Sequence, residues 1–347
     1  MATRFLRRGL TFLRTEVFVL PSRIIVLVFA LGLLLLPLFT DDAYILRILI
    51  MTSLLAIFAA SWDFLAGYSG QVNFGHALFF GGAAYTSALI NVHIGLPPLL
   101  SIPLGALFAG VLGALVGLLC LRLRGPYLSL VTLALPIILV SLFFAVPDLT
   151  GGELGIRRVA RITNDRVINY YIAVVLMLVV CSILWKIGDS KFGLILHALR
   201  EDQVALRAAG INTTRYKVMA FAISAVAAGL AGAVYGHFLR SVGPATLDVQ
   251  LSFQAVIFGV VGGMVSIVGP VAAVFVLYPL TEYLADFETF RAFRLLIFAV
   301  IVLLVLLFMP RGFVPWIRDR LETVCRRCKN RNVAARTTCR VCATVLR

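Results

Sequence analysis

Ten long runs of apolar residues, almost free of charge, follow one another along most of the chain and constrain its fold more than any other feature. A helix needs roughly 20 apolar residues to cross the hydrocarbon core of a bilayer. The composition agrees, because 61% of the residues are hydrophobic and 14% are charged, against about 45 to 50% and about 25% in soluble domains. This excludes a soluble globular protein. We expect an all-α polytopic membrane protein with about ten transmembrane helices, at residues 22–39, 43–66, 72–92, 98–120, 127–147, 168–187, 218–240, 250–268, 270–286 and 293–309.

The distribution of basic residues predicts the orientation of these helices. Of the 31 Lys and Arg residues, 23 lie in four polar segments, 1–23, 121–126, 186–217 and 310–347, and cytoplasmic loops carry an excess of such residues. We expect a multi-pass protein of the plasma (inner) membrane with both termini in the cytoplasm. The segment 148–167 carries four Arg on the other side, so a different pairing of the fifth and sixth spans is an alternative. Because topology accounts for the net charge of +15, the expected partner is the lipid bilayer and not nucleic acid.

Two glycine-rich breaks, at residues 67–76 and 259–270, lie at or near membrane depth. Irregular backbone survives there only where protein or a water-filled cavity covers it. The first break carries polar side chains that are costly in lipid unless they face a cavity or one another. We predict that they line a polar pathway, and the alternative is hydrogen bonding between helices without a ligand, which for His76 alone is the favoured interpretation. The polar residues are Tyr68, Ser69, Gln71, Asn73 and His76.

The segment 191–211 is too charged to span the membrane and too apolar for a free loop. Asp202 is a good N-cap and Gly210 a good residue to follow a helix end, so 203–209 is predicted to form a two-turn helix. Its Ala205, Ala208 and Ala209 permit close approach to another surface. We expect this helix to dock into a groove of a partner, and the alternative is an amphipathic segment lying on lipid.

Several motifs along the chain resemble those of one transporter family. They are residues 67–76 followed by Gly81-Gly82-Ala83-Ala84-Tyr85, the sequence Leu123-Arg124-Gly125-Pro126-Tyr127, residues 199–212, and Gly262-Gly263-Met264 with Gly269-Pro270. Over about residues 43–310, the chain resembles the permease of branched-chain amino acid ABC importers, LivM type.

The resemblance implies partners and roles for particular residues. The partners are a second, LivH-like permease, two ABC ATPase subunits and an extracytoplasmic solute-binding protein. The segment 191–211 is then the coupling loop seated on an ATPase, and Tyr85 joins the substrate pathway. The implied coupling residues are Arg200, Glu201, Ala205, Ala208, Ala209 and Gly210.

Four of the six cysteines lie in the C-terminal tail, as Cys325-Arg-Arg-Cys328 and, ten residues later, Cys339-Arg-Val-Cys342. Two such pairs can enclose one tetrahedral zinc ion. We therefore expect Zn²⁺ in a tail that resembles a short zinc ribbon, and no cofactor in the membrane domain. Disulfides are the alternative, which the reducing cytoplasm disfavours.

No GxxxxGK[ST] motif occurs in the chain, so ATP hydrolysis through a P-loop is excluded and we expect a transport permease, not an enzyme. The expected function is that of a permease subunit of an ABC importer for branched-chain amino acids or related small polar solutes, such as urea or amides. Partner ATPases would drive its alternating access. One alternative is a membrane-anchored scaffold or sensor whose zinc-binding tail is the working part. Another is a secondary transporter, for which Asp63 and Glu282 are the candidate carboxylates.

The expected domains follow from these assignments. They are a basic cytoplasmic N-terminal tail at 1–21, a transmembrane permease domain at 22–312 that includes the coupling loop, and a zinc-ribbon-like tail at 321–347.

Overall fold

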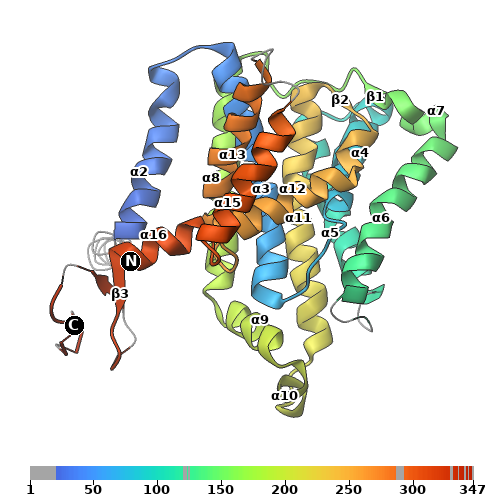
Figure 1. Cartoon of the computed structure of the whole chain (residues 1–347). Helices are drawn as coiled ribbons and strands as arrows, with labels where there is room; N and C mark the ends of the chain where they lie inside the picture. The colour runs from blue at the N-terminus through green and yellow to red at the C-terminus, as the bar shows by residue number, and fades with distance from the viewer. Residues whose placement is uncertain are drawn as a thin grey trace, which may run out of the picture.

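The computed structural model describes residues 21–119, 123, 126–286, 293–328, 331–334, 336–339, 341–342 and 344–345. Figure 1 shows a bundle of long helices with a small hairpin beside it. The expected basic N-terminal tail lies outside the described residues except for Pro21, and so do Arg124 and Gly125 of the sequence motifs.

The apolar runs form helices close to the predicted positions. They are α2 (Pro21–Leu35), α3 (Ala43–Asp63), α4 (Ala77–Leu89), α5 (Pro98–Leu119), α6 (Pro126–Ala145), α8 (Arg166–Gly188), α11 (Thr213–Leu239), α12 (Val249–Gly262), α13 (Val268–Asp286) and α15 (Arg294–Phe308). Within the described residues, nine helical segments are long and apolar enough to span a membrane, and α12 is a shorter apolar helix of 14 residues. The prediction of an all-α polytopic membrane protein is confirmed.

Short elements connect and flank these helices. They are η2 (Leu36–Leu38), η3 (Phe64–Tyr68), η4 (Ile90–Ile94), α7 (Pro147–Thr150), η6 (Gly152–Leu154), β1 (Ile156–Arg157), α9 (Lys191–Glu201), α10 (Gln203–Ala208), β2 (Ser241–Val242), η7 (Pro244–Leu247), α16 (Phe313–Leu321), β3 (Glu322–Val324) and β4 (Arg331–Val333). Strand β1 pairs antiparallel with β2, and β3 pairs antiparallel with β4.

The bundle has two distinct ends. In Figure 1, α9 and α10 lie at one end, here the α10 end, and α7 with the β1–β2 pair lies at the opposite end, here the β1–β2 end. The connection between α6 and α8 lies at the β1–β2 end. These two helices are therefore consecutive antiparallel spans, as the prediction of ten spans requires.

Two predicted spans have different boundaries in the structure. The run 72–92 becomes helical only at Ala77, and the run 250–268 is helical only to Gly262. At 1.5 Å per residue, the 14 residues of α12 reach about 21 Å, short of the hydrocarbon thickness of about 30 Å. Gly263 ends α12 with φ +102°, which an L side chain rarely adopts.

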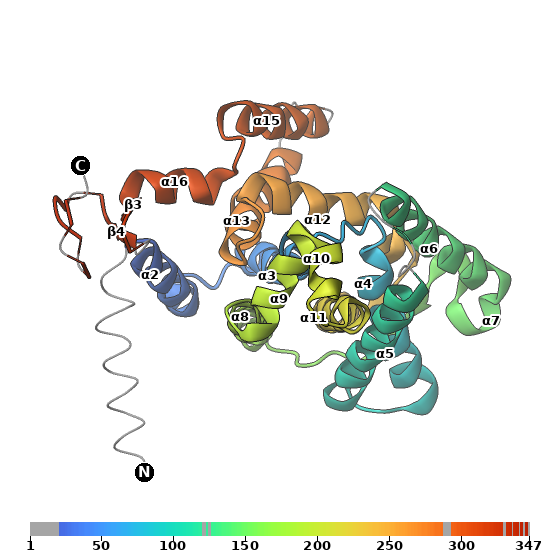
Figure 2. The same ribbon diagram turned by 90° about the horizontal axis from the view of Figure 1, so that it is seen from below.

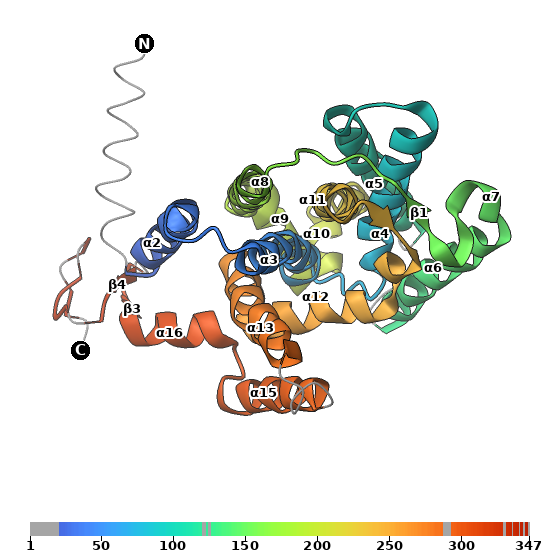
Figure 3. The same ribbon diagram turned by 90° about the horizontal axis from the view of Figure 1, so that it is seen from above.

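Helices α3 and α11 form the centre of the bundle, and α2, α6 and α15 lie toward its periphery (Figures 2 and 3). Helix α11 packs against α5, α4 and α3. Small residues make this close packing possible, because a Cβ added at Gly113 would clash with Ala225 and one added at Gly232 would clash with the backbone of Phe80. Without a hydrophobic driving force between helices in lipid, such close packing is a main source of stability.

Candidate functional site

The break at 67–76 connects η3 to α4 inside the bundle. All five of its predicted polar residues are buried, with at most 5% of their surface exposed. Tyr85, the sixth predicted pathway residue, is also buried.

His76 and Asn73 belong to one hydrogen-bond network. Ser61 Oγ lies 2.8 Å from His76 Nε2, and Asn73 Oδ1 accepts a hydrogen bond from the Gly75 N–H at 2.8 Å. The Trp62 indole N–H donates to the Asn73 carbonyl at 2.7 Å. These contacts fix the path of the backbone, as expected where polar groups are buried in a low dielectric.

Ser69 and Gln71 form a second, local group. Ser69 Oγ donates to the Leu65 carbonyl at 2.6 Å, and Gln71 Nε2 donates to Ser69 Oγ at 3.0 Å. The ring of Tyr68 stacks on His197 of α9, with centroids 4.9 Å apart. Partial burial lowers the pKa of His197, which favours its neutral form.

Tyr85 lies apart from the other predicted pathway residues. It belongs to a separate small cluster with Ile156 and Val242 near the β1–β2 end, and its ring centroid is 4.4 Å from that of Phe143. Its buried hydroxyl has no hydrogen-bond partner among the residues that the structure describes.

Helices α6 and α12 hold the break from the side. Thr132 Oγ1 accepts from the Phe74 N–H at 3.2 Å, and Ser129 Oγ donates to the Val72 carbonyl at 3.1 Å. Ser252 Oγ of α12 accepts from the Ala77 N–H at 2.9 Å. Sequence reasoning did not single out these three hydroxyl residues, although each is a small polar residue within an apolar run.

The two glycine-rich breaks meet at Asp63. Its carboxylate accepts hydrogen bonds from the backbone N–H groups of Val265, at 2.9 Å, and Ser266, at 3.0 Å. A Cβ at Gly67 would lie 2.8 Å from Val265 N, so the contact requires glycine. Asp63, a candidate carboxylate for a secondary transporter, is here a buried cap that joins the end of α3 to the second break, next to Gly67 of the first break.

The segment 191–211 forms two helices at the α10 end. Asp202 caps α10 by accepting from the N–H groups of Val204, at 2.8 Å, and Ala205, at 3.0 Å, and Gly210 follows with φ +81°. The predicted helix 203–209 is thus present as Gln203–Ala208.

The proposed coupling residues face two directions. The side chain of Arg200 turns toward the bundle, where Nη1 donates to the Gly67 carbonyl at 2.7 Å. The remaining residues are exposed, namely Glu201, Ala205, Ala208, Ala209 and Gly210. Arg200 therefore contacts the first break, and the five other residues lie exposed at the α10 end.

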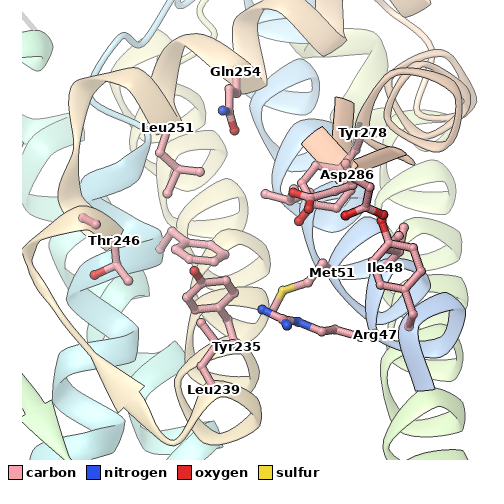
Figure 4. A pocket seen from close by; sticks show the side chains of 15 residues that line it. Arg47, Ile48, Met51, Tyr235, Leu239, Thr246, Leu251, Gln254, Tyr278 and Asp286 are labelled. Atoms are coloured by element: carbon pink, nitrogen blue, oxygen red, sulfur yellow. The ribbon is translucent and has the colours of Figure 1, made fainter. Parts of the chain in front are cut away.

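A pocket of about 400 Å³ lies toward the β1–β2 end, and none of the six predicted pathway residues lines it. Figure 4 shows its two walls, formed by α3 and α13 on one side and by α11, η7 and α12 on the other. Its charged residues are Arg47, Glu282 and Asp286. Of these three residues, the sequence analysis named only Glu282 as a functional candidate. Arg47 could have been found as an arginine inside the apolar run 43–66, since an intramembrane charge suggests function.

The four tail cysteines lie together beside the β3–β4 hairpin, with all four Sγ atoms within 4.8 Å of one another. The Sγ atoms of Cys325 and Cys342 are 3.5 Å apart, and those of Cys328 and Cys339 are 3.4 Å apart. A zinc–sulfur distance of about 2.3 Å in a tetrahedron places sulfur atoms about 3.8 Å apart. The cluster therefore fits a single tetrahedral metal ion.

The surroundings of the cluster favour thiolates, the form that binds metals. Hydrogen bonds from the backbone N–H groups of Cys342 and Val341 lower the pKa of Cys339 to about 6. The hydroxyl and backbone of Thr344 lower the pKa of Cys342. These residues can hold a metal ion, and they are free thiols in the structure.

The family model of the branched-chain amino acid transport system / permease component matches residues 44–306. The chain belongs to this family. The match ends before the cysteine tail, which this permease carries in addition.

Several characterised permeases are similar to this one. The high-affinity branched-chain amino acid transport system permease protein LivM of Salmonella typhimurium is 30% identical over 302 residues, which cover 78% of this chain and 70% of LivM. The ribose import permease protein RbsC of Haemophilus influenzae is 30% identical over 63% of this chain and 68% of its own. The nucleoside ABC transporter permease protein NupC of Lactococcus lactis is 26% identical over 58% of this chain and 71% of its own. No solved structure matches this permease significantly.

Proposed function

We propose that this permease is the LivM-type subunit of an ABC importer for branched-chain amino acids or related small polar solutes. It pairs with a second, LivH-like permease in the plasma (inner) membrane. Two ATPase subunits bind at the α10 end, which faces the cytoplasm together with both termini. A solute-binding protein delivers substrate at the β1–β2 end. The 30% identity to LivM and the excess of basic residues in the segments assigned to the cytoplasm support this assignment.

The main support for this coupling mechanism is the hydrogen bond from Arg200 to the Gly67 carbonyl. It joins the helices exposed at the α10 end directly to the break at 67–76. Movement of an ATPase against α10 would therefore pull on a glycine-rich segment whose path depends on a few hydrogen bonds. The break would change conformation and open alternately to the two sides, with Tyr68, Ser69, Gln71, Asn73, His76 and Tyr85 lining the pathway.

Ala209→Arg tests the coupling surface. The new side chain places a long charge where the ATPase docks, so ATP-driven uptake in the reconstituted importer should be abolished while insertion and folding are preserved. Thr337→Arg is the control, because Thr337 is also exposed but lies in the cysteine tail, beyond the family match and away from both proposed docking surfaces. Unchanged uptake in Ala209→Arg would show that α10 is not the coupling surface.

We also propose that the four cysteines bind one Zn²⁺ ion as a structural site of four thiolates. Such an ion would hold the two cysteine pairs together in a segment too short to bury a core of its own. All four coordination positions would be filled by protein, which leaves none for a reacting molecule.

A second candidate function, a scaffold or sensor that works through the tail, is favoured by one observation. The tail lies beyond the family match and has its own hairpin and cysteine cluster. Deletion of residues 321–347 separates the two functions. Transport should persist in a permease with an accessory tail, whereas a scaffold or sensor would lose its output.

A further inference from the structure

The pocket near the β1–β2 end combines one cationic and two anionic side chains with an apolar wall. Arg47 comes from α3, and Glu282 and Asp286 come from the last turns of α13. Across the gap lie Tyr235, Leu239 and Leu251 (Figure 4). A volume of about 400 Å³ falls within the roughly 300 to 1,000 Å³ typical of small-molecule sites.

The charges in this pocket are not neutralised by pairing with one another. Within the part of the chain that the structure describes, no carboxylate lies within ion-pair distance of Arg47. The hydroxyl-bearing side chains of Tyr44 and Tyr278 line the pocket together with the carboxylates of Glu282 and Asp286. The guanidinium therefore has its N–H groups available in the pocket, and Figure 4 shows the side chain reaching from α3 toward Tyr235.

We propose that this pocket is a binding site for a small zwitterion with an apolar side chain. Arg47 binds the carboxylate and Glu282 binds the ammonium group. Leu251 of the apolar wall and Met51 of α3 receive the side chain. Arginine suits the first role because its planar group can donate two parallel hydrogen bonds to a carboxylate. Asp286 is exposed, so water can solvate its charge at the mouth.

The location of the pocket defines its role in the transport cycle. It lies at the end opposite α10, on the side where the proposed binding protein releases its solute. The pocket is thus the first site on the permease to which the released substrate binds. This inference rests on the proposed importer function, and it distinguishes an amino acid from uncharged solutes such as urea, amides or sugars, which would leave Arg47 and Glu282 without a partner charge.

Equilibrium binding to the full-length chain in lipid nanodiscs tests the site with three probes. L-leucine carries both charges, L-leucinamide lacks the carboxylate, and 4-methylpentanoate lacks the ammonium group. Radiolabelled L-leucine should bind saturably with a dissociation constant in the range of about 1 mM, and the other two should compete at least about tenfold more weakly.

Substitutions assign each charge to its partner. Arg47→Gln should weaken L-leucine binding about tenfold and leave L-leucinamide binding unchanged, whereas Glu282→Gln should weaken L-leucine and leave 4-methylpentanoate unchanged. Arg161→Gln and Glu153→Gln are matched controls, because both side chains are exposed at the same end without lining the pocket. Arg47→Lys keeps the charge and should retain part of the affinity. This result would show that the weaker binding of Arg47→Gln does not come from misfolding.

The proposal is overturned if L-leucine shows no saturable binding up to about 100 mM, if the three probes compete equally, or if Arg47→Gln binds L-leucine like the wild type. Those outcomes leave the importer function intact as long as Ala209→Arg abolishes ATP-driven uptake. Conversely, normal uptake in Ala209→Arg would remove the coupling model without affecting a measured binding of L-leucine.

Discussion

Tyr85 is the residue at which the two interpretations of the polar side chains differ most clearly. Its hydroxyl is buried and has no hydrogen-bond partner among the described residues, and an unsatisfied buried polar group costs about 1 to 3 kcal/mol. The hydroxyls of Ser61 and Ser69 are, by contrast, hydrogen-bonded. A group that remains unsatisfied at such a cost is a candidate to bind a passing solute.

Tyr85→Phe should therefore lower the rate of uptake several-fold without lowering stability. Removal of the hydroxyl eliminates an unsatisfied group, so the free energy of unfolding should stay constant or rise by up to about 1 kcal/mol. Uptake by the reconstituted importer and thermal melting in detergent measure the two effects. Ser141→Ala is a control, because among the described residues its exposed hydroxyl donates to a carbonyl of its own helix, that of Ile137. Full uptake in Tyr85→Phe would exclude a role for this hydroxyl in the pathway.

At the scale of elements, hydrogen bonds link the two breaks to α3 and α9. Asp63 at the end of α3 caps the backbone that follows α12, and Arg200 of α9 holds the backbone that follows Asp63. These hydrogen bonds link three segments that are far apart in the sequence, namely residues 63–67, α9 and residues 265–266. Any movement of α9 relative to α3 must alter this junction.

Asp63→Ala should destabilise this junction. The N–H groups of Val265 and Ser266 would lose their acceptors in a buried site, at a cost of about 2 to 4 kcal/mol. Asp63→Asn keeps one acceptor oxygen and should cost less. Thermal melting of the detergent-solubilised protein measures both variants. Equal stability of Asp63→Ala and the wild type would show that the cap does not hold the two breaks together.

The helices could be predicted from the sequence, but the contacts between them could not. Apolar runs fix the spans because a membrane helix satisfies its own backbone, and the cap of Asp202 depends only on neighbouring residues. The anchors of the first break, Thr132 and Ser252, are 58 and 175 residues away from their partners. Arg47 meets Glu282 in one pocket only after α3 and α13 have packed together.

At the scale of the whole molecule, the tail is attached to the membrane domain at a defined place. Ser22 Oγ at the start of α2 donates to Glu322 Oε1 of β3 at 2.5 Å. Helix α16 leads into the hairpin, and the guanidinium of its Arg320 lies 4.0 Å from the centroid of the Trp316 ring. The cysteine cluster is therefore positioned on the side of α2, where α16 lies in Figure 1.

The metal site should be detectable in the intact protein. Cobalt added to the full-length chain in detergent should give the intense visible bands of tetrahedral thiolate coordination, saturating at about one equivalent, and zinc should bleach them because it binds thiolates more tightly. Cys339→Ser removes one of the four ligands and should abolish these bands. Cys181→Ser should leave them unchanged, because Cys181 lies within α8 and outside the cluster.

The same measurement connects the site to the fold of the tail. Because Cys325 and Cys328 lie between β3 and β4, and Cys339 and Cys342 follow β4, a bound ion would close the loop that contains β4. Removal of the metal with a chelator should therefore make the tail sensitive to protease while the helices of the bundle stay protected. Cobalt bands that persist in Cys339→Ser, or protease resistance that chelation does not change, would show that the cysteines do not form a structural metal site.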